Sequence, residues 1–208
     1  DTINYGLAYE ETKVTTFADS PLFYLDYVAT FGRQTDAILA TAGWVRDGRD
    51  SLIYPTKGVM QRATGEITVP GGSLKYYKAT YQYQRYFPLT RHYTLMLNGE
   101  LGYGEGLDNR PLPFFKNFFA GGVNSVRGYR SSTIGPKDQN GNPRGGSHRI
   151  VGNAEFLFPF PGLQNDKSVR LGGFVDAGMI SEKFDSGDFR YSTGLSLFWS
   201  SPFGPIKM

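Results

Sequence analysis

The sequence predicts an all-β protein, a transmembrane antiparallel β-barrel, and three observations favour this fold class. Apolar and polar residues alternate with period two along most of the 208 residues, as strands with two different faces require. The chain has 14 Tyr and 16 Phe, yet it contains no run of about 18 apolar residues, which excludes a transmembrane helix. The connections between predicted strands also differ in length, as in barrels with short turns at one rim and longer loops at the other.

Alternation by itself also fits a soluble all-β domain, in which the apolar face forms the core and the charges face solvent. The aromatic residues favour the membrane barrel, because they gather near strand ends on the apolar faces, as an aromatic girdle requires. The connection lengths agree with this choice: residues 11–34 and 104–148 are long, whereas residues 47–57 and 200–205 are shorter.

Four strands are predicted in the N-terminal half of the chain, at residues 2–10, 35–46, 58–69 and 75–87. Residues 21–31 break the alternation and predict a short amphipathic helix that lies on a surface. Ser20 is its predicted N-cap, and Pro21 occupies the first helical position.

Four further strands are predicted at residues 93–103, 149–158, 168–179 and 189–199. The start of a ninth strand is predicted at Ile206. Because outer-membrane barrels usually close with an even number of strands, we expect the barrel to include strands beyond these 208 residues.

Side chains alternate between the two faces of a strand, and this strand parity places the carboxylates of Glu155 and Asp176 on the polar faces of two consecutive strands. Glu155 shares its face with Arg149, and Asp176 shares its face with Arg170. In a barrel this polar side faces the lumen. One interpretation is therefore that Glu155 and Asp176 are solvated lumen charges that pair with these two arginines.

The longest stretch without strand pattern covers residues 104–148. A loop of this length is uncommon in a compact protein unless it is functional or disordered, and its four Phe residues between 114 and 119 are not typical of disorder. Its centre reads Val126-Arg127-Gly128-Tyr129. Gly128 provides backbone freedom at the tip, and Gly121 and Gly122 allow a sharp reversal of the chain.

Residues 119–129, which contain this motif, closely resemble the signature loop of the BamA family, the barrel subunits that assemble outer-membrane proteins. Residues 54–58, 102–104, 132–137 and 201–206 extend the resemblance over nearly the whole chain. In the wider bacterial surface antigen superfamily the motif reads Val-Arg-Gly followed by Phe or Tyr. The variant with Tyr, present here at Tyr129, also resembles the motif of FhaC-type two-partner secretion transporters. Gly121-Gly122 and the tail at residues 134–137 favour the BamA family.

The resemblance implies a sixteen-stranded barrel in the bacterial outer membrane, of which residues 1–208 form the C-terminal half, with the last strand incomplete or missing. It implies that the loop folds into the lumen, where the motif's arginine meets acidic residues at the positions of Glu155 and Asp176. The planar fork of Arg127 suits bidentate pairing with a carboxylate. The family's periplasmic repeats are not among these residues.

The implied function is assembly and insertion of β-barrel proteins. The implied partners are outer-membrane lipids, unfolded β-barrel clients and the lipoproteins of the assembly complex, which bind mainly through parts outside this chain. Two alternatives are a two-partner secretion transporter, which exports one polypeptide through its lumen, and a passive porin.

Several kinds of site have little support. Without cysteine there is no disulfide or thiolate site, and the two histidines, His92 and His148, do not have ligand spacing, so we expect no metal and no cofactor. Asp138 begins a calcium-loop-like stretch, but Pro143 stands where a glycine is needed, which favours a simple turn. No Ser/His/Asp set or P-loop predicts an enzyme. The modest net charge of +3, with scattered Lys and Arg, argues against nucleic-acid binding.

Overall fold

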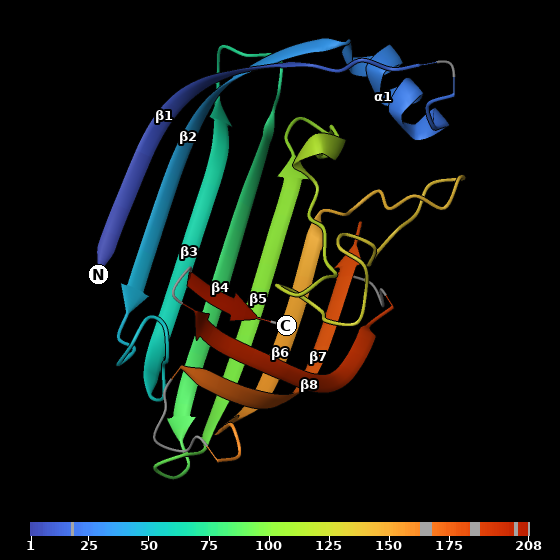
Figure 1. Ribbon diagram of the computed structural model, residues 1–208. Helices are drawn as coiled ribbons and strands as arrows, with labels where there is room; N and C mark the ends of the chain where they lie inside the picture. The colour runs from blue at the N-terminus through green and yellow to red at the C-terminus, as the bar shows by residue number, and fades with distance from the viewer. Residues whose placement is uncertain (18, 163–167, 184–187, 202–203, 208) are drawn as a thin grey trace.

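The computed structural model describes the whole chain except residues 18, 163–167, 184–187, 202–203 and 208. The described residues form one antiparallel sheet in which each strand pairs with its neighbours in sequence, in the order β1 to β9 (Figure 1). The strands are β1 (Thr2–Lys13), β2 (Gln34–Asp47), β3 (Gly58–Val69), β4 (Tyr76–Pro88), β5 (Thr94–Gly106), β6 (His148–Pro159), β7 (Val169–Ser181), β8 (Arg190–Ser201) and β9 (Gly204–Lys207).

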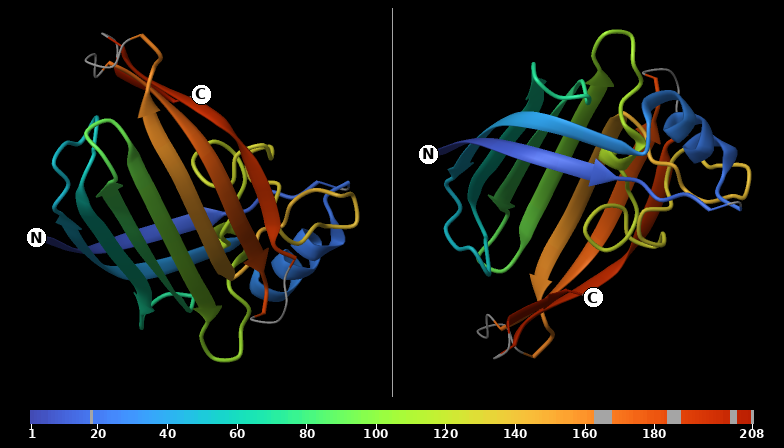
Figure 2. Two further views of the ribbon diagram at one scale, coloured as in Figure 1. Left: turned by 90° about the horizontal axis from the view of Figure 1, so that it is seen from below. Right: turned by 90° about the horizontal axis from the view of Figure 1, so that it is seen from above.

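The predicted strands are confirmed, with small shifts at their ends. β5 continues to Gly106, so the long loop covers residues 107–147, and β9 begins at Gly204, earlier than predicted. The sheet curves into a trough, and part of the loop at residues 107–147 lies on its concave side, while another part projects beside helix α1 (Figure 2). This side corresponds to the inside of a barrel.

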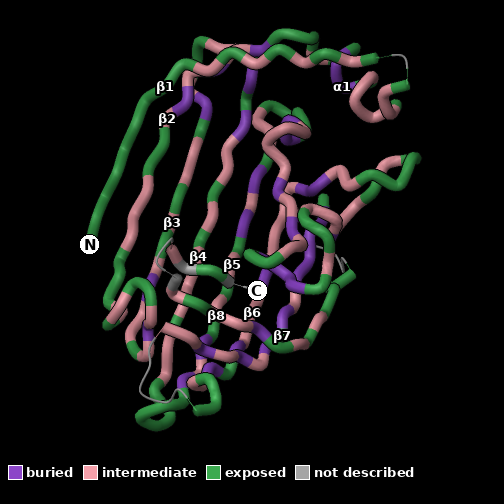
Figure 3. The backbone as a smooth tube through the Cα atoms, in the orientation of Figure 1, coloured by how far each residue is buried: buried purple, intermediate pink, exposed green. Residues whose placement is uncertain are grey.

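The burial of the two faces decides between the membrane barrel and the soluble domain. The apolar faces predicted from parity are open to the surroundings: Tyr5 is 90% exposed and Leu195 is 82% exposed. By contrast, Glu155 and Asp176 on the polar face are fully buried. Buried residues gather where β6 and β7 meet the loop, whereas β1 is exposed along most of its length (Figure 3). An apolar face this exposed suits lipid, since a soluble sandwich would bury it as its core.

Helix α1 (Leu22–Phe31) begins one residue later than predicted. Pro21 is its N-cap and makes no side-chain capping bond, so the prediction of Ser20 as the cap was wrong. The Ser20 hydroxyl instead accepts a hydrogen bond from the backbone N–H of Phe17, 2.9 Å away, which stabilises the turn before the helix.

Helix α1 packs on the long loop through aromatic rings. The ring centroid of Tyr27 lies 5.2 Å from that of Phe114, with the planes at 89°, and Tyr24 contacts the same ring at 4.7 Å. Burial raises the pKa of Tyr27 to about 12.

No helix in the described part of the chain is long and apolar enough to cross a membrane.

Candidate functional site

The long loop forms a small folded unit before it meets the strands. Phe118 and Gly146 exchange two backbone hydrogen bonds, of 2.8 and 3.0 Å, and the N–H of Ile134 donates to the carbonyl of Ala120 at 3.0 Å. These bonds join the two limbs of the loop, so its tip is presented by a defined scaffold.

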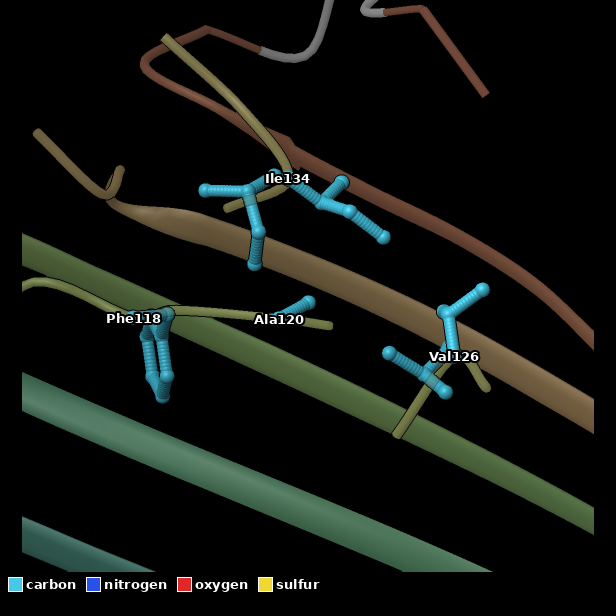
Figure 4. Packing of buried hydrophobic residues seen from close by; sticks show 6 residues of the cluster. Phe118, Ala120, Val126 and Ile134 are labelled. Carbon is cyan, nitrogen blue, oxygen red and sulfur yellow. The ribbon is translucent and has the colours of Figure 1, made fainter. Parts of the chain in front are cut away.

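An apolar cluster attaches this unit to the strands (Figure 4). Four of its buried residues come from the loop and two come from β6 and β7; the members are Phe118, Ala120, Val126, Ile134, Val151 and Ile180. Val126, directly before the arginine of the motif, is fully buried. Burial of these apolar side chains therefore provides the non-directional attraction that holds the loop on β6 and β7.

Arg127 makes the directional contacts, and we call Arg127, Glu155 and Asp176 the arginine latch. Nε and Nη2 of Arg127 donate to the two carboxylate oxygens of Asp176, both at 2.7 Å, and Nη1 donates to Oε1 of Glu155 at 2.7 Å. The backbone N–H of Arg127 also donates to Asp176, at 3.0 Å. The residue is only 6% exposed, and its Cζ lies 3.6 Å from the centroid of the Phe174 ring.

The latch keeps its arginine charged. Burial alone would lower the pKa of Arg127, but the hydrogen bonds that it donates to Asp176 and the attraction of Glu155 outweigh this effect, and the pKa lies above its usual value. Desolvation offsets much of the attraction in a buried ion pair, so the net contribution to stability is small. Loss of either partner is costly, however, because a buried charge then remains unpaired. The latch therefore selects one loop position.

Three glycines shape the docking surface. A Cβ on Gly178 would lie 2.5 Å from Cγ2 of Val126, and a Cβ on Gly172 would lie 2.8 Å from Oε1 of Glu155. Gly128 itself has φ +82°, in the left-handed region that favours glycine. Without side chains at these points, the strand face leaves space for Val126 and for Glu155, which also accepts a hydrogen bond from Ser196.

The remaining motif residues complete the tip. Gly121 and Gly122 have φ of +110° and +96°, and a Cβ on Gly121 would lie 2.4 Å from the carbonyl oxygen of Arg130. The hydroxyl of Tyr129 donates to the carbonyl of Tyr191 in β8, at 3.1 Å. The structure thus brings all the predicted site residues to one region between the loop and β6–β8.

The two strand arginines have other partners. Arg149 donates to Glu100 at 2.8 Å and to the loop carbonyl of Phe119 at 3.0 Å. Arg170 donates to the carbonyl of Pro55 at 2.9 Å. Among the described residues, Glu155 and Asp176 form their salt bridges with Arg127. The direct salt bridges of these carboxylates are therefore with Arg127, and in the described part of the chain none is with Arg149 or Arg170.

Lysines from the strand and the loop add contacts that were not predicted. Nζ of Lys78 donates to the carbonyl of Lys116 at 2.8 Å and lies 4.2 Å from the ring centroid of Phe118. Nζ of Lys116 pairs with Glu10 of β1 at 2.9 Å. The hydrogen-bond partner of Lys78 is a backbone carbonyl, which leaves no signal in the sequence.

A ladder of amides also reaches the tip across adjacent strands. Gln82 donates to Asn98, and Asn98 donates to Asn153, both at 2.9 Å. Asn153 then donates to the loop carbonyl of Ser125 at 2.7 Å. The ladder connects β4, β5 and β6 to the residue two positions before Arg127, so it positions the tip.

Replacing Asn153 by Ala should loosen the tip without releasing it. The carbonyl of Ser125 and the amide of Asn98 would each lose a partner. A fully buried group left unsatisfied costs about 1–3 kcal/mol, and these bonds are partly buried, so we expect the lower end of that range. We expect the folded barrel to show faster tryptic cleavage within residues 107–147, but slower cleavage than after loss of Arg127. Asn140→Ala, in an exposed turn of the same loop, is the matched control. Equal cleavage of Asn153→Ala and the parent would contradict a positioning role.

The sheet is antiparallel and apolar on its outer face, and Arg127 holds a long loop against its inner face. These features define part of a transmembrane β-barrel of the outer-membrane class. The chain belongs to the Omp85 superfamily, whose domain matches residues 1–208. Among solved structures it is similar to BamA from Haemophilus ducreyi lacking POTRA domains 1–3, with a TM-score of 0.86 and 24% identity over 99% of this chain and 46% of that one.

The curated relatives include the outer membrane protein assembly factor BamA of Neisseria meningitidis, which is 36% identical over all of this chain and 31% of the relative. BamA of Nitratidesulfovibrio vulgaris is 31% identical over 81% of this chain and 22% of the relative. A SAM50-like protein of Schizosaccharomyces pombe is 30% identical over 76% of this chain and 36% of the relative. The resemblance to the BamA family is thus confirmed, and the chain spans well under half the length of these relatives.

Proposed function

We propose that this chain is the barrel segment of a bacterial outer-membrane factor that assembles and inserts β-barrel proteins. The observation that carries the proposal is the signature loop, which is docked inside the sheet through the bidentate contact of Arg127 with Asp176 and its third bond to Glu155. The relatives named as assembly factors support the same function.

In this proposal the arginine latch has a mechanical role and is not a catalytic centre. It fastens the loop to β6 and β7, and the separate bond of Tyr129 fastens the loop to β8. Because the docked loop stiffens β6 to β8, these strands keep their register. Strands that separate during insertion then lie in other parts of the barrel. An open strand edge presents unpaired N–H and C=O groups, which can pair with an incoming client strand.

The proposed partners follow from the two faces of the sheet. Outer-membrane lipids contact the exposed apolar face, and unfolded β-barrel proteins are the clients. Lipoproteins of an assembly complex bind mainly to parts of the protein beyond these residues. We propose no enzymatic reaction and no cofactor for the segment.

Depletion of the full-length protein tests this function. We expect the levels of many unrelated outer-membrane β-barrel proteins to fall together, because each depends on the same insertion step. Loss of one secreted polypeptide, with normal levels of other barrels, would instead identify a secretion transporter. A large steady ion conductance with no dependence of any client on the protein would identify a porin.

A further inference from the structure

The turn between β2 and β3, residues 48–57, makes a contact across the concave side of the sheet. Its Pro55 carbonyl accepts the 2.9 Å hydrogen bond from Nη1 of Arg170, near the start of β7. β3 and β7 are separated by β4, β5 and β6 in the strand order, or about 19 Å along the sheet at about 4.8 Å per strand. A turn that stayed in line with its strands could not reach β7, so this turn folds inward.

Arg170 holds the turn by ring stacking as well as by this bond. Its Cζ lies 4.2 Å from the ring centroid of Tyr54, in the turn, and 5.4 Å from that of Phe198, in β8. The residue is 4% exposed, and within the described ranges no carboxylate forms a salt bridge with it. A guanidinium placed over two aromatic faces and bonded to a carbonyl is suited to fastening a backbone segment.

The turn is itself a preformed unit. The carboxylate of Asp50 accepts hydrogen bonds from the backbone N–H of Thr56 at 2.8 Å and from that of Lys57 at 3.1 Å. Gly58 has φ +109°, and a Cβ there would lie 2.2 Å from the carbonyl oxygen of Gly48. The two ends of the turn are therefore held together, and movement about them would carry Tyr54 and Pro55 as one body.

We propose that residues 48–57 form an inner gate at the rim opposite helix α1, and that Arg170 holds this gate closed. Figure 1 shows the turn and the helix at opposite ends of the sheet. In outer-membrane barrels the rim with short turns is the periplasmic one. Arg127 fastens the long loop to β7 from one end of the trough, and Arg170 fastens the turn to the same strand from the other end.

Cysteine accessibility in the full-length protein tests the gate. These 208 residues contain no cysteine, so a single introduced thiol reports its own site in this segment. Pro55 is buried in the closed gate, and Pro55→Cys retains the carbonyl that Arg170 contacts. Leu52, at 76% exposed in the same turn, is the matched control as Leu52→Cys. Each thiol is labelled in permeabilised cells with a polar maleimide, with and without Arg170→Met.

We expect Arg170→Met to raise the labelling rate of Pro55→Cys by about tenfold, which corresponds to about 1.4 kcal/mol, and to leave the rate of Leu52→Cys within about twofold. A parallel measurement in planar bilayers should show higher conductance for Arg170→Met. Barrel folding is checked by the heat-dependent mobility of the protein in gels. An unchanged Pro55→Cys rate in folded Arg170→Met protein, or an equal rise at both thiols, would overturn the gate.

If Arg170→Met fails to fold, Arg170→Lys and Tyr54→Ala take its place. Arg170→Lys keeps the charge but loses the planar fork, and Tyr54→Ala removes the ring on which the guanidinium lies. Each should raise the labelling rate of Pro55→Cys above that of the parent, while the labelling rate of Leu52→Cys stays unchanged. If neither folded variant changes the Pro55→Cys rate, Arg170 does not hold the turn.

Discussion

Replacing Arg127 by Ala is expected to free the loop at residues 107–147 and to cause the largest loss of assembly function of any single change in this segment. Glu155 and Asp176 would stay buried after losing their salt bridges to Arg127, and breaking a buried pair in this way costs about 3–5 kcal/mol. The loop should become sensitive to trypsin in barrels that are still folded, and the levels of client barrel proteins should fall in cells that depend on the variant.

Arg127→Lys is the informative partner of this variant. An ammonium group restores one positive charge but cannot make the bidentate contact with Asp176 and the bond to Glu155 at the same time. We therefore expect partial recovery of both protease resistance and client levels. If Arg127→Ala leaves assembly and loop protection as they are in the parent, docking through the latch is not required for function.

Replacing Gly178 by Ala should displace the tip of the loop without removing any charge. The added methyl group would lie 2.5 Å from Cγ2 of the fully buried Val126, and overpacking of this kind costs about 1–3 kcal/mol. Loop cleavage by trypsin should accelerate, and client levels should fall, though less than in Arg127→Ala. Gly152→Ala in the neighbouring strand is the control, since nothing lies within 4 Å of its Cβ position.

A second substitution makes this prediction specific. Val126→Ala removes the methyl group that Gly178→Ala would contact, so the double variant should be better protected than Gly178→Ala alone. Such non-additivity is expected for residues that touch or share a cavity, whereas distant independent sites give additive effects. Strictly additive effects of the two changes, measured as cleavage rates, would count against packing of Val126 on Gly178 as the cause.

Much of the fold could be predicted because strand parity is a local property. Alternation located the strands to within a few residues and placed Glu155 and Asp176 on one face, and the motif identified Arg127 as a candidate partner. The cap of α1 was predicted wrongly, because Ser20 and Pro21 match the usual signal while the Ser20 hydroxyl bonds to Phe17 instead.

Contacts with backbone carbonyls could not be predicted. Lys78, Arg149 and Arg170 donate to the carbonyls of Lys116, Phe119 and Pro55, and every residue type has such an acceptor. Their partners are distant in sequence, by up to 115 residues, so local pattern carries no information about them.

By itself, the sequence determined the period of two, the division of each strand into an apolar and a polar face, and the motif at the tip of the long loop. The aromatic pattern favoured an apolar face that meets lipid, and the family resemblance implied the acidic partners of Arg127. The tertiary structure decided both points, and it alone showed that Arg149 and Arg170 bind elsewhere. The physical reason is that parity assigns a side chain to a face. The curvature of the whole sheet determines which groups on that face come within hydrogen-bonding distance.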